Sequence, residues 1–184
     1  KLRPILLAIK TSTYNWAKFF VPILRPLTFN TFTIKDSFEF GKNITDQNAE
    51  LYMASLDVDS LFTNVPLDET INICVNELFQ TQTSYFNINR KQIFEMLSLT
   101  TKEPIISFDG GFYSQVDGVA MGSPLGPTIA NAFLCHHEQK WLDDCPLDFK
   151  PLYYKRYVDD IFLLFKKLEH AKNFADYMNS KHKN

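Results

Sequence analysis

The alternation of apolar and polar residues along the chain predicts both strands and helices. Residues 51–57 alternate well enough to form a buried strand with Asp57 at its carboxyl end. Other segments carry apolar residues at helical spacing, so that one side of each helix would face a core. We expect helices over 67–78, 90–99 and 169–178, and hairpins formed by 105–108 with 112–116 and by 153–157 with 160–165. This order of elements predicts an α+β fold in which helices pack on one face of a sheet.

Capping residues and prolines mark where several helices begin or end. A helix is expected after Ser12 or Thr13, and Pro22 should end or kink it. A longer helix has two candidate starts, Ser123-Pro124 and Gly126-Pro127, because each pair has the form that helix N-termini favour. The sequence leaves the choice between these two starts open.

Two adjacent carboxylates, Asp159 and Asp160, lie within a run of aromatic and branched apolar residues that would otherwise form one strand. Strand interiors disfavour Asp, and one of the two side chains would have to enter the core unpaired. A tight turn at Val158-Asp159 removes this conflict by placing both carboxylates at the tip of a hairpin. Because Val is a poor turn residue, we expect a strained turn, which is more often tolerated at functional sites. The alternative is an edge strand that ends in a solvated acidic turn, and this segment alone leaves both interpretations open.

Three segments in a fixed order resemble the catalytic boxes of reverse transcriptases. Residues 157–160, Tyr-Val-Asp-Asp, resemble the Tyr-x-Asp-Asp box. Residues 55–67 resemble the first catalytic box, in which a strand ends in an Asp, and residues 118–127 resemble the box that precedes the long palm helix. The amino-acid sequences of the last two boxes are most similar to those of Penelope-like retroelements. They read Asp-Ser-Leu-Phe-Thr-Asn-Val-Pro and Val-Ala-Met-Gly-Ser-Pro-Leu-Gly-Pro. Three ordered matches over about a hundred residues support the resemblance strongly. The probability that all three arise by chance is the product of three small probabilities.

The resemblance implies a right-hand polymerase fold. Residues 51–184 would form the palm, an antiparallel sheet with helices packed on one face, incomplete at its C-terminal end. Residues 1–50 would form part of the fingers, and the thumb would be absent. Together they would make one fragment of a reverse transcriptase domain.

The resemblance also implies a metal-dependent active site. Asp57, Asp159 and Asp160 would be the catalytic carboxylates, and Asp57 and Asp159 would bridge two Mg²⁺ ions, for which Mn²⁺ is an alternative. The backbone carbonyl of Val58 would be a further metal ligand. Mg²⁺ prefers such oxygen ligands, and carboxylates that converge without a cation repel one another. The ions would lie near the attacking and leaving oxygens of nucleotide transfer.

Further residues would contact the nucleotide and the nucleic acid by the same resemblance. Phe62 has the place of the aromatic residue that clashes with a ribose 2′-hydroxyl and so favours deoxynucleotides; without its flanking box it would be interpreted as a core residue. Gly122 would let the backbone approach nucleotide and template closely, and Met121 stands where many reverse transcriptases have Gln. The nucleotide-binding set is Arg3, Asp59, Ser60, Leu61, Phe62, Met121 and Gly122, and the template and primer set is Tyr157, Val158, Gly122, Ser123 and Pro124.

Composition and charge agree with one globular domain, but not with a strongly basic nucleic-acid-binding protein. The 184 residues are 45% hydrophobic and carry a net charge of −2, which clustered metal-binding carboxylates would lower. No apolar run approaches the roughly 18 residues of a membrane span, so no membrane partner is expected. Cys74, Cys135 and Cys145 are few and odd in number, which indicates thiols in a reducing compartment. Cys135, His136, His137 and Cys145 lack the paired short spacing of a zinc site.

We therefore expect an RNA-directed DNA polymerase domain of a retrotransposable element, which uses an RNA template, a DNA primer and dNTPs. The element type implies location in the nucleus. An RNA-dependent RNA polymerase is the nearest enzymatic alternative, but such enzymes typically place a second Asp where this chain has Phe62. The other alternative is a non-catalytic nucleic-acid-binding remnant, against which the intact carboxylates argue. Without a thumb, the grip on primer and template should be weak, because phosphate contacts carry most of such affinity.

Overall fold

The computed structural model describes residues 5–9, 11–44, 50–80, 85–102 and 105–182. The chain forms two compact units. The first contains Lys1–Phe29 and Ser60–His136, and the second contains Asn30–Asp59 and His137–Asn184. Each unit therefore combines segments that are distant in the sequence.

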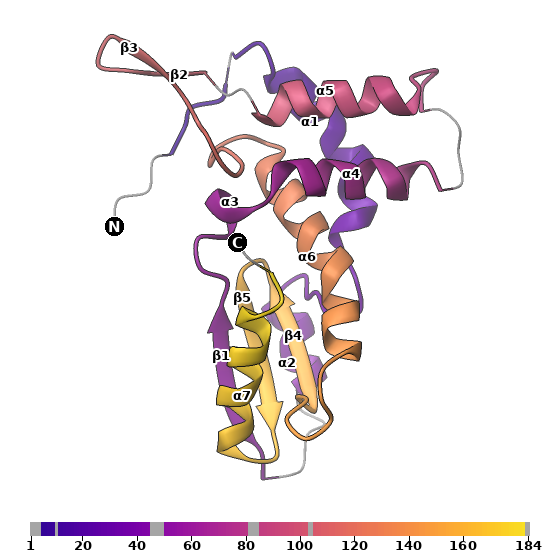
Figure 1. Cartoon of the computed structure of the whole chain (residues 1–184), viewed down its shortest axis with the longest axis vertical. Coiled ribbons are helices and arrows are strands. Elements are labelled where there is room, and N and C mark those ends of the chain that lie inside the picture. Colours follow the sequence, from indigo (N-terminus) through magenta and orange to yellow (C-terminus); the bar gives the residue numbers. More distant parts are fainter. Residues whose placement is uncertain (1–4, 10, 45–49, 81–84, 103–104, 183–184) are drawn as a thin grey trace. The chain divides into compact units, whose positions relative to one another are not determined.

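The second unit is built on a three-stranded antiparallel sheet, in the order β1-β5-β4 (Figure 1). Its strands are β1 (Tyr52–Asp57), β4 (Tyr153–Tyr157) and β5 (Asp160–Phe165). The predicted strand and the predicted hairpin are both confirmed, and the hairpin strands begin and end where the sequence placed them. The central strand β5 carries the most continuous apolar run, as expected for a strand with a neighbour on each side.

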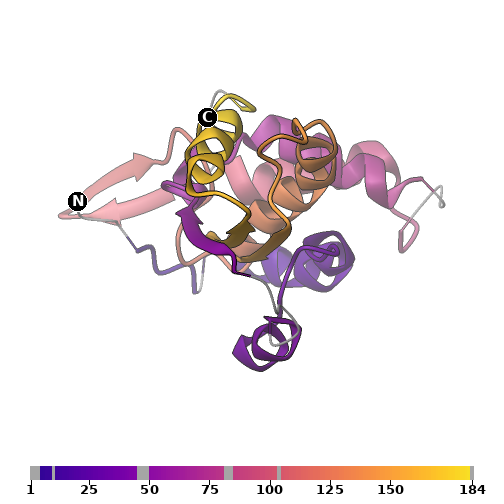
Figure 2. The ribbon, with the colours of Figure 1, turned by 90° about the horizontal axis from the view of Figure 1, so that it is seen from below.

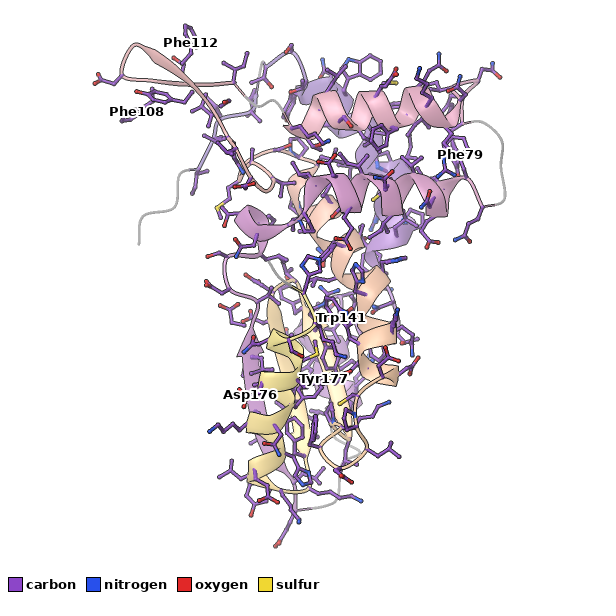
Figure 3. All side chains as sticks on the ribbon, viewed as in Figure 1. Phe79, Phe108, Phe112, Trp141, Asp176 and Tyr177 are labelled. Atoms are coloured by element: carbon purple, nitrogen blue, oxygen red, sulfur yellow. The ribbon has the colours of Figure 1, made fainter. Side chains whose placement is uncertain are left out.

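One face of this sheet packs against α7 (Leu168–Asn179) and the last turns of α6 (Gly126–Asp143). Phe174 of α7 is fully buried against Phe165, with a ring-centroid distance of 5.8 Å. The cluster also contains Leu163 of β5 and Leu142 of α6. Figure 3 shows Tyr177 and Trp141 close together, and the Tyr177 hydroxyl donates to the Trp141 carbonyl oxygen at 2.7 Å. These contacts make the predicted helix-covered face.

The opposite face of the sheet meets α2 (Ser37–Ile44), a contact that the sequence did not predict. The rings of Phe40 and Phe162 lie edge to face at 5.0 Å, and Figure 2 shows α2 and α7 on opposite sides of the sheet. The start of this helix is capped: the Glu39 N–H donates to Asp36 Oδ1 at 2.9 Å, and the Lys35 N–H donates back to Glu39 Oε2.

The first unit is mainly helical. It contains α1 (Tyr14–Leu24), the 3₁₀ helix η1 (Arg25–Thr28), α3 (Leu61–Asn64), α4 (Leu67–Leu78) and α5 (Arg90–Lys102). Pro22 lies inside α1 without ending it. The predicted apolar side of α4, with Ile71 and Cys74 fully buried, packs against α5 within this unit. Periodicity shows that a helix has a buried side, but not what covers it.

The start of α6 is resolved at Gly126, with Pro127 in its first turn. Ser123-Pro124 instead forms the preceding turn, in which the Gly126 N–H donates to the Ser123 carbonyl oxygen at 3.1 Å. Residues up to His136 belong to the first unit and the remainder of α6 belongs to the second.

A two-stranded hairpin, β2 (Ile105–Phe108) with β3 (Gly111–Ser114), completes the first unit. Its second strand begins one residue earlier than predicted and ends two residues earlier, because the turn needs only Asp109 and Gly110, with φ of 49° and 76°. Phe108 and Phe112 project from this hairpin in Figure 3 and are 71% and 79% exposed. In the part of the chain that the structure describes, no helix has the length and apolar character needed to span a membrane.

Candidate active site

The turn between β4 and β5 has the strain that the sequence predicted. Tyr157 pairs with Asp160, so Val158 and Asp159 form a two-residue loop. Val158 has a φ of 56°, in the left-handed region that two-residue hairpins normally fill with Gly or Asn. For a β-branched residue this is an outlier. The predicted hairpin is therefore confirmed. Because β4 is an edge strand that ends in this turn, the geometry agrees equally with the alternative of an edge strand and a solvated acidic turn.

The ends of two neighbouring strands bring the predicted carboxylates together. Asp57 is the register partner of Asp160, and directly opposite residues in antiparallel strands have Cα atoms about 4.5–5.5 Å apart. The Val58 N–H donates to the Asp159 carbonyl oxygen at 3.0 Å, which ties the residue after the first Asp to the turn. Asp57 and Asp160 are exposed, and Asp159 is half-buried. All four residues belong to the second unit.

The donors at this strand end suit a hard divalent cation. Carboxylate and carbonyl oxygens are the ligands that Mg²⁺ prefers, and Asp57 and Asp160 share one face because side chains alternate along each strand. Among the described residues, no group of three or more His, Cys, Asp or Glu side chains is gathered closely enough to hold an ion. The structure thus brings two of the carboxylates opposite each other with Asp159 beside them, and the metal-ligand roles of Asp57, Val58, Asp159 and Asp160 stay predictions.

A buried ion pair that the sequence analysis missed lies next to this turn. Arg156 of β4 and Glu138 of α6 are each 1% exposed, and the guanidinium contacts the carboxylate through Nε–Oε1 at 2.5 Å and Nη2–Oε2 at 3.1 Å. The Tyr154 hydroxyl and the Asn30 side-chain amide also donate to Glu138, at 2.9 and 2.7 Å. Side chains two positions apart in a strand lie on the same face, so the burial of Tyr154 predicts that Arg156 is buried too. The buried position of Arg156 could have been predicted from the sequence in this way.

The predicted nucleotide residues Ser60, Leu61 and Phe62 lie in the first unit, at the start of α3. Ser60 is left-handed with φ 52°, and Leu61 is buried. The Val119 N–H donates to the Phe62 carbonyl oxygen at 2.7 Å, which joins the first catalytic box to the box around residue 118. Phe62 itself is half-buried. Its role in excluding a 2′-hydroxyl stays a prediction, and so do the roles of Ser60 and Leu61.

Close packing explains why residue 122 is a glycine. Gly122 has a φ of 105°, and a Cβ atom there would lie 2.0 Å from the Leu6 carbonyl oxygen. The Leu6 N–H donates to the Met121 carbonyl oxygen at 2.8 Å, so segment 5–8 runs against this loop. The crowding at Gly122 comes from the chain's own backbone, and the expected approach of nucleotide and template to this residue stays a prediction.

The remaining predicted residues have different positions. Ser123 and Pro124 line a cavity of about 1000 Å³ in the first unit, together with segment 5–8, the start of α1 and the β2–β3 hairpin. Asp59 and Tyr157 are exposed residues of the second unit. Arg3 lies outside the described residues.

The three cysteines form no disulfide, as predicted. Cys74 is fully buried in α4, and this burial raises its pKa to about 12. Burial also raises the pKa of Cys145, although nearby Lys150 lowers it in part. Among the described residues, no metal-binding cluster forms at Cys135, His136, His137 and Cys145.

Comparison with known proteins identifies what the chain is similar to. A family model described as reverse transcriptase (RNA-dependent DNA polymerase) matches residues 1–184. A search of curated proteins gave no match. One similar solved structure is apo telomerase from Candida tropicalis truncated from its C-terminal domain, with 15% identity, a TM-score of 0.62, and coverage of 94% of this chain and 38% of that one.

Two further solved structures are similar to the same extent. Apo telomerase from Candida tropicalis has 13% identity and a TM-score of 0.60, and covers 93% of this chain and 33% of its own. Telomerase from Candida albicans in complex with a TWJ fragment of telomeric RNA has 15% identity and a TM-score of 0.61, with coverage of 92% and 32%. The chain spans about a third of the length of these proteins. At such identities the likeness shows the fold, and the predicted α+β class is confirmed; the division into fingers and palm at residue 50 stays a prediction.

Proposed function

The chain belongs to the reverse transcriptase (RNA-dependent DNA polymerase) family, and on that premise we propose that it is the polymerase domain of a retrotransposable element of the Penelope-like type. It adds dNTPs to a DNA primer on an RNA template. The observation that carries the proposal is the pairing of Asp57 with Asp160 at the strand ends, with Asp159 in the strained turn beside them. The Penelope-like type rests on the amino-acid sequence of residues 59–66 and 119–127.

The strand-end residues would hold the metal ions of this reaction. Asp57, Asp159, Asp160 and the Val58 carbonyl oxygen would bind two Mg²⁺ ions, or Mn²⁺. When bound, such ions supply Lewis-acid stabilisation of the charge that develops on the phosphate oxygens. A rigid sheet suits this task because Mg²⁺ tolerates little distortion of its ligands. The sheet fixes the backbone of Asp57 and Asp160 by register pairing, and the Val58 N–H fixes that of Asp159.

Phe62 would select the sugar of the incoming nucleotide. Its carbonyl oxygen accepts a hydrogen bond from the Val119 N–H, and the residue is only partly buried. A ring beside the ribose excludes a 2′-hydroxyl by steric overlap and admits a deoxyribose. Backbone N–H groups near Ser60 would meet the triphosphate, and they carry no net charge. RNA template, DNA primer and dNTPs are the proposed partners, and the nucleus is the proposed location.

Primer extension tests the proposal. The full-length protein that carries this chain is given an RNA template, a DNA primer, Mg²⁺, and either dNTPs or rNTPs. Asp159→Asn should abolish extension with dNTPs, because an amide cannot replace a carboxylate as an anionic metal ligand. Asp176→Asn is the matched control, since it removes the same charge from the exposed side of α7 and should extend normally (Figure 3).

Each other outcome has a defined meaning. Preference for rNTPs would favour an RNA-dependent RNA polymerase and refute the role of Phe62. A protein that binds primer and template but extends neither substrate would favour the non-catalytic remnant. Activity retained by Asp159→Asn would refute the assignment of the catalytic carboxylates.

A further inference from the structure

The guanidinium of Arg156 is completely buried, and its three nitrogen atoms donate hydrogen bonds to two different groups. Its Nε and Nη2 donate to the Glu138 carboxylate at 2.5 and 3.1 Å. Its Nη1 donates to the Val158 carbonyl oxygen at 2.7 Å. Both side chains of the ion pair are at most 1% exposed, so water does not compete for the hydrogen bonds between Arg156 and Glu138. The guanidinium therefore connects helix α6 to the first peptide of the β4–β5 turn.

Both peptide groups that flank Asp159 are held by hydrogen bonds from outside the turn. The carbonyl before Asp159 accepts from Arg156, and the carbonyl of Asp159 accepts from the Val58 N–H at 3.0 Å. The backbone of Asp159 is thus held between a buried side chain and the end of β1. Since Val158 is left-handed, the turn would relax toward other conformations without such restraints.

The anchoring of Arg156 is itself extensive. Its backbone N–H donates to the Phe32 carbonyl oxygen at 2.8 Å, and its own carbonyl accepts from the Ile34 N–H at 3.0 Å. Glu138 is held in turn by Tyr154 and Asn30. The planar guanidinium can donate two hydrogen bonds to one carboxylate and direct a further N–H to another acceptor. A lysine ammonium is a point charge and cannot reproduce this forked geometry.

We propose that Arg156, fixed by Glu138, is a positioning residue that holds the strained Val158-Asp159 turn and so presents Asp159 for catalysis. The proposal rests on the proposed function, in which Asp159 is a catalytic carboxylate. Arg156 touches neither the substrate nor the metal in this role. It acts only through the Val158 carbonyl.

The first test is kinetic and uses the full-length protein. Arg156→Lys keeps the charge beside Glu138 but loses the forked contact, and it should lower kcat about 10- to 100-fold, as loss of a supporting residue typically does, with KM for dNTPs little changed. Tyr154→Phe is the matched control, because it removes one hydrogen bond to Glu138 and none to the turn. It should lower the melting temperature but keep kcat.

A second substitution separates positioning from general stability. Glycine adopts a positive φ without strain, so Val158→Gly should restore part of the kcat lost in Arg156→Lys, since the turn then needs less restraint. A merely stabilising ion pair predicts no such rescue. A kcat that falls equally in Arg156→Lys and Tyr154→Phe, or a loss that Val158→Gly leaves unchanged, would overturn the proposal.

If Arg156→Lys does not fold, the pair is replaced as a whole. Arg156→Met combined with Glu138→Met leaves no unpaired buried charge, and such replacements are often neutral or stabilising. This variant should fold and show the same loss of kcat. Wild-type kcat in the folded double variant would refute the role of Arg156.

Amide hydrogen exchange gives a readout that does not depend on polymerase activity. Because the Val58 N–H is bonded to the turn, it should exchange about tenfold faster or more in Arg156→Lys, while the Leu163 N–H in the sheet centre keeps its protection. Unchanged exchange at Val58 would refute the proposal even in an inactive protein. Asp159→Asn should abolish extension without altering this exchange, and extension that survives in it would count against the proposed function alone.

Discussion

Substitution of Gly118 by alanine tests how the two boxes of the first unit are packed. Gly118 has a φ of 68°, and a Cβ atom there would lie 2.3 Å from the Phe62 carbonyl oxygen and 2.5 Å from two backbone atoms of Thr63. These are backbone atoms that cannot rotate away. Gly118→Ala must therefore either move the α3 turn or distort the loop before Val119.

The expected loss of stability is the sum of separate effects. A left-handed alanine costs about 1–2 kcal/mol, and displacing a packed backbone costs about 1–3 kcal/mol. Weakening the bond from the Val119 N–H to Phe62 costs about 1 kcal/mol more. The stiffer unfolded chain returns about 0.4–1 kcal/mol. We expect Gly118→Ala to lower the free energy of unfolding by about 2–5.5 kcal/mol.

Two other glycines provide controls for the separate effects. Gly110 has a φ of 76° and nothing within 4 Å of an added Cβ, so Gly110→Ala should show only the conformational effect, a net loss of about 1 kcal/mol. Gly41 lies within helix α2 with open space around it, so Gly41→Ala should stabilise by about 0.5–1 kcal/mol.

Urea unfolding of the full-length protein, followed by circular dichroism, measures the series. From the most to the least stable, we expect the order Gly41→Ala, wild type, Gly110→Ala and Gly118→Ala. Equal stability of Gly118→Ala and Gly110→Ala would show that α3 does not lie against Gly118. It would also remove the structural link between Phe62 and the box that begins at residue 118.

Two further predictions concern selectivity and thiol chemistry. Phe62→Val should lower the ratio of kcat/KM for dNTPs to that for rNTPs by about tenfold or more, because a smaller side chain no longer overlaps a 2′-hydroxyl; Phe79→Val, at another partly buried aromatic, should leave that ratio unchanged (Figure 3). Mass spectrometry after brief iodoacetamide treatment at neutral pH should find Cys135 modified well before the buried Cys74, whose pKa of about 12 keeps it a thiol. Equal labelling of Cys74 and Cys135 in the folded protein would contradict the burial of Cys74. Because the pKa of Cys74 is raised on folding, this residue should contribute stability that is fully present below pH 9.0 and is lost as the pH rises toward 12.

The β4–β5 hairpin could be predicted from sequence because two physical demands agreed. The apolar alternation required strands, and the two adjacent carboxylates could not both avoid the core unless the chain turned at Val158-Asp159. The strain at Val158 followed from the same reasoning, since no residue suited to a tight turn is available there. Local pattern thus located Asp159 and Asp160 at a hairpin tip.

Contacts between distant segments could not be predicted in this way. The hydrophobic pattern of a sequence does not predict which distant residues become neighbours. Examples are the pairing of Arg156 with Glu138, the contact of Gly122 with Leu6 and the packing of α4 on α5. A single sequence shows that a side chain faces inward, but the identity of its neighbour depends on the whole fold. The choice between two helix starts at residues 123 and 126 had a similar cause, because both have suitable local chemistry.

The pairing of β1 with β5 has a consequence for how the protein folds. About a hundred residues separate the two strands along the chain, whereas β4 and β5 are joined by two residues. The local hairpin can form within microseconds, but β1 leaves the ribosome long before its partner exists and must wait for a large loop to close. During synthesis Asp57 is therefore separated from Asp160, and nascent chains that stop before residue 160 lack the paired carboxylates. The pairing of β1 with β5 should therefore be the slow step of folding. A chaperone that shields the unpaired β1 strand should raise the yield of folded protein.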